Sequence, residues 1–239
     1  MKIISIIKIL KIISPILMAL FMTVSAIGQN SGKTINNEEE NLRIQDIDGN
    51  SYNTIKIGHQ IWLSRNLQTT RYSDGSPIPN VTDNTEWTGL STGAYCYYNN
   101  DSAIYKKIYG ALYNWFTVVD KRNLCPTGWH IPSDNEWNTL ETYLGGSRGT
   151  GGTLKETVDK HWISPNTAAT NKSGFSSLPG GIRYYLGPFA YIGGFGYWWS
   201  SSEGSNNLAW SLTLSSRNGN FCRNTCDKGN GFSVRCLRD

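Results

Sequence analysis

The sequence predicts an α+β fold with a small antiparallel sheet, two helices and long irregular loops. Three observations predict it. Apolar and polar residues alternate near both ends of the folded part of the chain, as they do in half-buried strands. A helix-start pattern stands near the middle. The composition combines 12% aromatic residues with 25 glycines, which indicates loop-rich connections held by large rings.

Residues 1–28 have the pattern of a secretory signal peptide. A lysine-containing start precedes an apolar run at 12–22, and a site of small residues ends at Gly28. The apolar run is too short to span a bilayer, which needs roughly 20 residues. We therefore expect a flexible leader at 29–41, a single domain at 42–239, and no transmembrane span in the mature chain. The expected location is extracellular, cell-surface or periplasmic.

Removal of the signal also changes the charge of the chain. The full sequence carries a net charge of +4, and the signal contains Lys2, Lys8 and Lys11 but no acidic residue. The mature chain then has 19 basic residues against 18 acidic ones. So balanced a chain gives no electrostatic reason to expect binding to nucleic acid or to an anionic membrane.

The first predicted strands form an antiparallel meander. Residues 42–48 turn at Gly49-Asn50 into 52–57, and a second turn at Gly58-His59 leads into 61–63. Alternating spacing predicts one buried face, made of Ile55, Ile57, Ile61 and Leu63.

The first of these turns also resembles the start of a calcium-binding loop. Asp46 and Asp48 have the right spacing, but the twelfth position is Ile57 where a calcium loop needs a glutamate. We therefore predict a hairpin turn here.

The middle of the chain predicts a surface loop followed by two helices. Residues 71–100 are rich in turn residues and read as the loop. The first helix would start at Ser102, with Gly110 as a weak point. Its apolar stripe would be Ile104, Ile108, Leu112, Trp115 and Val119.

The second helix has a clearer start signal. Ser133 and Glu136 fit a capping box, in which each side chain bonds the other's backbone amide. Trp137, Leu140 and Leu144 then share one face, and Gly145-Gly146 ends the helix. The cap explains Glu136 without assigning it, with His130, to acid–base chemistry.

The last part of the chain combines a long loop region with strands. Residues 145–197 show little regular pattern, and loops of this length are usually functional or held by local packing. Alternation then predicts two strands that form a hairpin with one buried face. Their apolar residues are Trp210, Leu212 and Leu214 in the first strand, and Phe232, Val234 and Cys236 in the second.

Several motifs in order resemble one family. They are Cys125-Pro126-Thr127-Gly128-Trp129-His130 with Pro132-Ser133-Asp134-Asn135-Glu136-Trp137, Tyr197-Trp198-Trp199-Ser200-Ser201-Ser202-Glu203, Gly231-Phe232-Ser233-Val234-Arg235-Cys236, and the segments 46–52, 57–62, 66–67, 109–115, 171–175 and 178–181. Together they resemble the Fibrobacter succinogenes major paralogous domain family of exported bacterial proteins. That family is similar to C-type lectin-like and formylglycine-generating-enzyme-like domains, which implies a disulfide-bonded, C-type-lectin-like fold.

In an exported protein cysteines are expected to form disulfides, and with five of them the odd thiol is most simply a buried small apolar residue. Spacing alone leaves many pairings open. The family resemblance implies a bridge between Cys125 and Cys236. Cys222 and Cys226 are expected to form a local bridge within a polar loop, and the pairing of Cys96 is not determined.

The expected function is a non-enzymatic binding or adhesion module for a glycan or a cell-surface partner. Exposed rings could stack on sugars, and the candidate residues are Arg183, Tyr184, Tyr185, Phe189 and Tyr191. The calcium-dependent sugar motifs of true C-type lectins are absent from the sequence. No cofactor is expected.

Two alternatives belong to other classes. A copper-dependent oxidase of the formylglycine-generating type could use Cys222 and Cys226, since soft thiolates suit copper(I). The spacing and position of this pair depart from that family's pattern. A structural or assembly role at the cell surface is the other alternative.

Other catalytic or metal sites are not indicated. His59, His130 and His161 lack metal-ligand spacing. Glu203 and Asp134 could be named as a glycosidase pair, but nothing in the sequence places them together.

Overall fold

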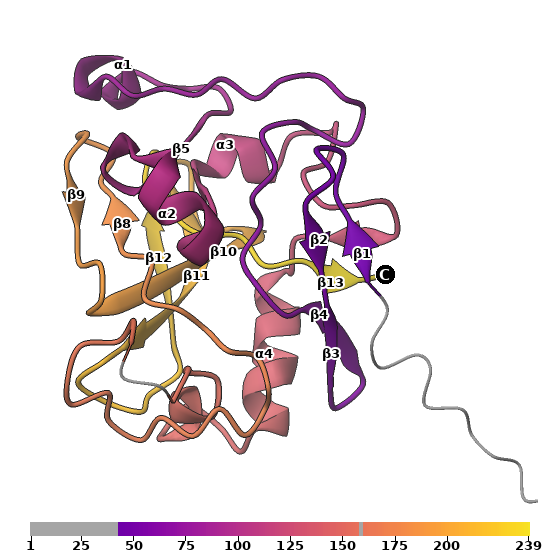
Figure 1. The fold of residues 1–239 in the computed structure, drawn as a ribbon, viewed down its shortest axis with the longest axis vertical. Coiled ribbons are helices and arrows are strands. Elements are labelled where there is room, and N and C mark those ends of the chain that lie inside the picture. Colours follow the sequence, from indigo (N-terminus) through magenta and orange to yellow (C-terminus); the bar gives the residue numbers. More distant parts are fainter. Residues whose placement is uncertain (1–42, 158–159) are drawn as a thin grey trace, which may run out of the picture. The chain divides into compact units, whose positions relative to one another are not determined.

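The computed structural model describes residues 43–157 and 160–239, and it has the mixed helix and antiparallel-sheet content that the sequence predicts (Figure 1). The predicted signal peptide and leader lie outside the described residues. Within the described ranges the helices are α1 (Asn84–Thr88), α2 (Ser102–Tyr109), α3 (Trp115–Val118) and α4 (Asp134–Tyr143), with 3-10 turns η2 (Tyr98–Asn100) and η3 (Thr150–Thr153). None of these helices is both long and apolar enough to cross a membrane.

The amino-terminal strands begin as predicted. A short hairpin of β1 (Ile44–Gln45) and β2 (Ser51–Tyr52) precedes a sheet in the order β3-β4-β13-β7, in which every pair is antiparallel. Its strands are β3 (Thr54–Ile57), β4 (Gln60–Leu63), β7 (Trp129–His130) and β13 (Leu237–Arg238). The last strand, β13, therefore lies between the β3–β4 hairpin and β7, which comes from the middle of the chain.

The single buried face predicted for the first meander is wrong. A two-residue turn at Gly58-His59 places Ile57 opposite Gln60 and Ile55 opposite Trp62. Since side chains alternate along a strand, Ile61 and Leu63 point to the other face. Both faces are used: Ile57 and Trp62 pack in one core cluster, and Leu63 packs in another.

The predicted long helix after residue 102 is also wrong. Asp101 caps α2 by accepting from the amide of Ile104 at 3.0 Å, and the helix ends at Gly110, whose φ is +81°. A Cβ at Gly110 would lie 2.5 Å from the carbonyl oxygen of Leu67, so the chain needs glycine here. Leu112 then enters β6 (Leu112–Tyr113), and α3 follows as a separate turn.

The second predicted helix is confirmed as α4. The Ser133 hydroxyl accepts from the Glu136 amide at 3.3 Å, and the Glu136 carboxylate accepts from the Ser133 amide at 2.7 Å. Trp137 and Leu140 are fully buried. The Trp137 ring lies 4.7 Å from that of Trp62, and its Nε1 donates to Trp199 O at 3.4 Å, so α4 packs between the β3–β4 hairpin and the strand that carries Trp199 (Figure 1).

The carboxyl-terminal hairpin forms between other residues than predicted. The three-stranded sheet has the order β10-β11-β12, with β10 (Phe195–Glu203), β11 (Leu208–Ser215) and β12 (Cys222–Asp227). The strand that follows β11 in the chain and pairs with it, β12, is therefore the segment expected to be a polar loop. Residues 231–236 instead make single bridges, with Phe232 opposite Tyr113 and Ser233 opposite Trp198.

Trp198 and Trp199 join the two main core clusters. Both are fully buried, and because they are adjacent on β10 they point to opposite faces of the sheet. Trp198 packs with Trp137 in one cluster, and Trp199 packs with Phe232 in the other. Their indole nitrogens donate to Asn66 Oδ1 at 2.8 Å and to the Tyr113 carbonyl at 2.7 Å.

The two predicted loop regions differ in how much regular structure they contain. Segment 71–100 is not a surface loop: it contains α1 and β5 (Tyr95–Cys96), and it buries Tyr72, Ile78 and Trp87. Segment 145–197 is mostly irregular, as expected. Its regular parts are η3, β8 (Ile182–Arg183), β9 (Phe189–Ala190) and the start of β10.

Candidate binding site

The predicted binding residues lie on the β8–β9 hairpin. Arg183 pairs with Phe189, and the tip is closed by hydrogen bonds from the Tyr184 amide to Pro188 O and from the Gly187 amide to Tyr184 O, both 2.8 Å. The tip exposes Tyr185, which is 41% accessible, and Leu186 beside it. The hairpin therefore presents an apolar surface on a backbone that its own hydrogen bonds hold.

The prediction that Arg183 contacts a ligand is wrong, because its side chain is fully buried. Its guanidinium donates to the carbonyls of Val81 (2.5 Å), Thr82 (3.0 Å), Asp83 (3.1 Å) and Gly187 (3.0 Å), and to Asn84 Oδ1 (3.1 Å). Burial and these five hydrogen bonds keep the guanidinium away from a ligand at the surface.

Aromatic rings also enclose Arg183. The rings of Trp87 and Phe189 lie 4.3 and 5.0 Å from the guanidinium carbon. Phe189 is half-buried in this contact. Arg183 and Phe189 therefore support the hairpin, and Arg183 also holds segment 81–84 against it.

A line of aromatic rings connects the hairpin to the core. Tyr184 contacts Tyr191, with centroids 6.1 Å apart, and Tyr191 contacts Phe195 at 5.3 Å. Stacked contacts continue through Tyr197 to Phe232 at 6.0 and 4.9 Å. A hydrogen bond with the Tyr191 hydroxyl, with some burial, raises the pKa of Tyr184 to about 12.

Tyr191 is held in an unusual backbone conformation. Its φ is +66°, a region that bulky residues rarely enter, and its carbonyl accepts from the amides of Gly194 and Phe195 at 3.0 Å. Its ring is 49% accessible. The turn therefore holds an aromatic side chain at the surface in a conformation that costs energy, a feature that clusters at functional sites.

A surface pocket of about 210 Å³ lies beside Tyr185. We call it the Tyr185 pocket, and it is lined by Thr88, Leu90, Phe116, Tyr185, Asn206, Asn207, Asp227, Lys228 and Gly229. The Tyr185 amide donates to Asn230 Oδ1 at 2.9 Å, which fixes the base of this side chain. The pocket thus combines an exposed ring with amide, carboxylate and ammonium groups.

Lys228 is a buried residue of the Tyr185 pocket lining. Its ammonium lies 4.6 Å from the Trp115 ring, pairs with the Glu203 carboxylate, and donates to the Asn206 carbonyl at 2.8 Å. The pairing assigns Glu203 to a structural contact. Sequence reasoning missed Asn206, Asn207 and Asp227. The pairing of β11 with β12 brings these residues together, and the hydrogen bond from Tyr185 to Asn230 brings Tyr185 to the end of β12.

A larger pocket of about 450 Å³ includes Pro77, Pro79 and Phe116. Its charged side chains, Asp120 and Arg122, pair with each other at 2.7 Å. None of the predicted binding residues lines it, so the Tyr185 pocket is the better candidate.

The cysteines separate into one bridge and three thiols. Cys125 and Cys236 are joined, with Cα atoms 6.0 Å apart, which confirms the bridge that the resemblance implied. Cys96 is buried, and burial raises its pKa to about 12.

The predicted bridge between Cys222 and Cys226 is wrong. Both lie on β12, and four residues of strand span about 13 Å, whereas a disulfide needs Cα atoms within about 7 Å. Burial also raises the pKa of both thiols.

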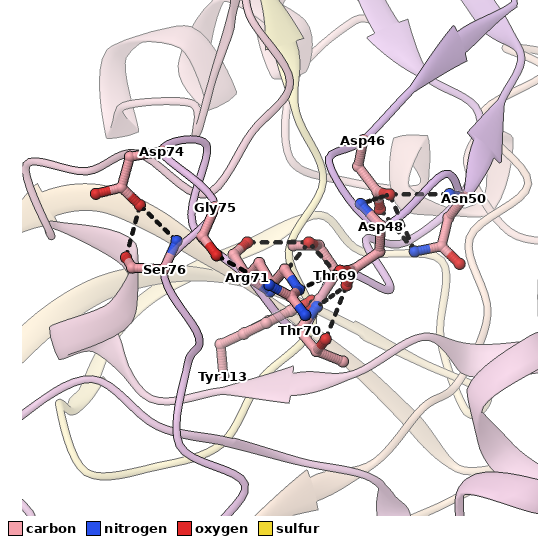
Figure 2. A network of polar contacts seen from close by, with 10 residues as sticks. All are labelled: Asp46, Asp48, Asn50, Thr69, Thr70, Arg71, Asp74, Gly75, Ser76 and Tyr113. Carbon is pink, nitrogen blue, oxygen red and sulfur yellow. Dashed lines mark hydrogen bonds and ion pairs between the residues drawn. The ribbon is translucent and has the colours of Figure 1, made fainter.

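The Asp46 turn is a hydrogen-bonded hairpin turn, as expected. Figure 2 shows the Asp46 carboxylate accepting from the amides of Asp48 (3.0 Å) and Asn50 (2.9 Å). Asp48 in turn accepts from the amide and hydroxyl of Thr70, at 2.5 and 2.8 Å, and pairs with Arg71 at 3.2 Å. These oxygens are occupied by protein donors.

The remaining candidate groups are in structural contacts. His130 lies between Glu136 (2.8 Å) and Asp239 (2.6 Å), and Asp134 pairs with Arg223 at 2.7 Å. Across residues 43–157 and 160–239, no group of three or more His, Cys, Asp or Glu side chains could hold a metal ion.

Comparison with known proteins gives one match. The model of the Fibrobacter succinogenes major domain matches residues 55–238, which is most of the chain. No curated protein and no solved structure matches this chain.

Proposed function

The chain belongs to the Fibrobacter succinogenes major domain family, and we propose that it is an exported, non-catalytic binding module with a C-type-lectin-like fold. Its ligand would be a glycan, free or carried by a cell-surface partner, bound at the Tyr185 pocket. Export is supported by the signal pattern at residues 1–28 and by the Cys125–Cys236 bridge, since disulfides persist in oxidising compartments.

The juxtaposition at the Tyr185 pocket carries this proposal. A sugar has an apolar C–H face and several hydroxyl groups. The exposed Tyr185 ring offers a flat apolar surface, while Asn206, Asn207 and Asp227 offer hydrogen-bond donors and acceptors. The small pocket and its open position suit one terminal sugar unit.

Copper chemistry is not part of the proposal. Cys222 and Cys226 lie about 13 Å apart along β12, so one ion could not bind both without breaking the strand. Copper(I) favours thiolates, whereas burial raises the pKa of both groups and so disfavours the thiolate form.

Binding of the mature protein to a glycan array tests the proposal, with Tyr185→Ala as the variant and Tyr143→Ala as its matched control. Tyr143 is an exposed tyrosine that does not line the pocket. We expect saturable binding, weakened about tenfold by Tyr185→Ala, as for the loss of about 1.4 kcal/mol of contact energy. Tyr143→Ala should bind normally. Blank arrays, or equal effects of the two variants, would contradict the proposal.

A further inference from the structure

The outer edge of β12 has a short stretch of free main chain. β12 is the last strand of the order β10-β11-β12, and Asn224 and Thr225 are exposed. An edge strand of this kind can accept a strand from another chain. The register of β12 determines which of its groups point outward.

One hydrogen bond shows which residues of β12 form hydrogen-bonded pairs with β11. The Lys228 amide donates to Asn207 O at 3.0 Å, so residues 207 and 228 form a hydrogen-bonded pair. Such pairs alternate in antiparallel ladders, so the amides and carbonyls of Arg223, Thr225 and Asp227 point away from β11. The Phe221 amide follows the same rule, because it donates to Ser147 O at 2.8 Å, outside the β11 ladder.

The free stretch is limited at both ends. The Ser147 carbonyl occupies the edge at Phe221, and the Asn230 amide occupies the carbonyl of Asp227 at 3.0 Å. Between these ends, the outward main chain of Arg223 and Thr225 has no partner in the part of the chain that the structure describes. The free edge is therefore centred on Asn224.

A two-fold axis at Asn224 would use the free main-chain groups of Arg223 and Thr225. Arg223 would then lie opposite Thr225 of a second copy and form a hydrogen-bonded pair with it. Asn224 would face its own counterpart, and no two like charges would be opposite each other. Arg223 would keep its side chain on α4, where it binds Asp134 and Glu141 at 2.7 and 2.8 Å.

The same axis brings thiols together. Cys222 and Cys226 lie two residues on either side of Asn224 and share its face of the strand. Cys222 would therefore lie opposite Cys226 of the second copy, in a non-hydrogen-bonded pair with Cα atoms about 4.5 Å apart. That spacing is within the range of about 4.4–6.8 Å found for disulfides.

We propose that the β12 edge is an interface for a second copy of this chain, locked by two symmetric disulfides between Cys222 of each copy and Cys226 of the other. This goes beyond ligand binding at the Tyr185 pocket. Each bridge forms as two thiols lose two protons and two electrons, while one disulfide of a small-molecule oxidant such as oxidised glutathione is reduced to two thiols. Because this short edge would bury little surface, the reduced protein should be monomeric.

Oxidation of single-cysteine variants tests the register. The reduced mature protein is incubated with oxidised glutathione and analysed by non-reducing electrophoresis, and linked peptides are identified by mass spectrometry. We expect a wild-type dimer linked between Cys222 and Cys226. Cys222→Ser alone and Cys226→Ser alone should each stay monomeric, because each bridge needs one of each thiol. An equimolar mixture of the two variants should give at least ten times more dimer than either alone.

A Cys96→Ala variant is the matched control, since Cys96 is fully buried and should not affect dimer formation. Several results would overturn the proposal: a wild type or mixture that stays monomeric, dimers in a single variant alone, or a peptide linking Cys222 to Cys222. A bridge between Cys222 and Cys226 within one chain would also overturn it.

Discussion

The Cys125–Cys236 bridge should supply a large part of the stability of this domain. The two cysteines are 111 residues apart, and both are fully buried. Closing a loop of this length lowers the entropy of the unfolded chain by an amount worth about 5 kcal/mol at 25 °C. Domains typically have a total stability of about 5–15 kcal/mol, so the double variant Cys125→Ala/Cys236→Ala should be marginally folded.

Urea unfolding at 25 °C measures this loss, and Cys96→Ala is the control for removing one buried sulfur. If loop closure is the cause, the double variant should lose well over twice the free energy of unfolding that Cys96→Ala loses. A loss no greater than twice the control would refute it, because packing alone would then explain the effect.

The same variant should weaken one particular part of the sheet. β13 has only two residues, follows Cys236 directly, and lies between β4 and β7. The Leu63 amide donates to Cys236 O at 3.0 Å, so hydrogen exchange at Leu63 reports on this attachment. We expect Leu63 to exchange faster in the double variant than the α4 amides do, since α4 has its own hydrogen bonds.

Two further predictions concern ionised groups. Burial lowers the pKa of His130, but the carboxylates of Asp239 and Glu136 outweigh it and raise this pKa above 6.5. The stabilisation that protonated His130 gains from these two carboxylates is therefore complete below pH 6.5, and it is lost as the pH rises through the folded-state pKa. Stability should fall as the pH rises above 6.5 in urea titrations, with a smaller fall in His130→Gln; parallel curves would contradict this. Arg183→Lys should lower stability by about 2–4 kcal/mol, because one ammonium cannot reach all the acceptors of the guanidinium fork. A change below about 0.5 kcal/mol in urea unfolding would show that the fork is dispensable.

Local signals predicted part of this fold well. The Ser133–Glu136 capping box lies within four residues, and the two-residue turn at Gly58-His59 joins adjacent strands. Both are satisfied by neighbours in the sequence, so no tertiary information is needed to find them. The irregular character of 145–197 follows from composition in the same way.

Longer-range features were missed where one residue changed the geometry. Apolar spacing continues past Gly110, but the approach of the Leu67 carbonyl ends the helix there. The spacing of Ile61 and Leu63 suits either face, and the turn length decided which. Arg183 looked like a surface residue, and only the fold surrounds it with carbonyls and rings.

The sequence by itself determined the family, the α4 start, and the helix-and-sheet content, because these depend on motifs and periodicity along the chain. Tertiary structure decided which residues form the Tyr185 pocket and which cysteines pair. Asn206 and Asp227 lie near Tyr185 because β11 pairs with β12 and Asn230 contacts Tyr185, and the extended strand keeps Cys222 from Cys226. The physical reason is that strand pairing joins distant segments, and a shift of one residue would turn each side chain to the other face.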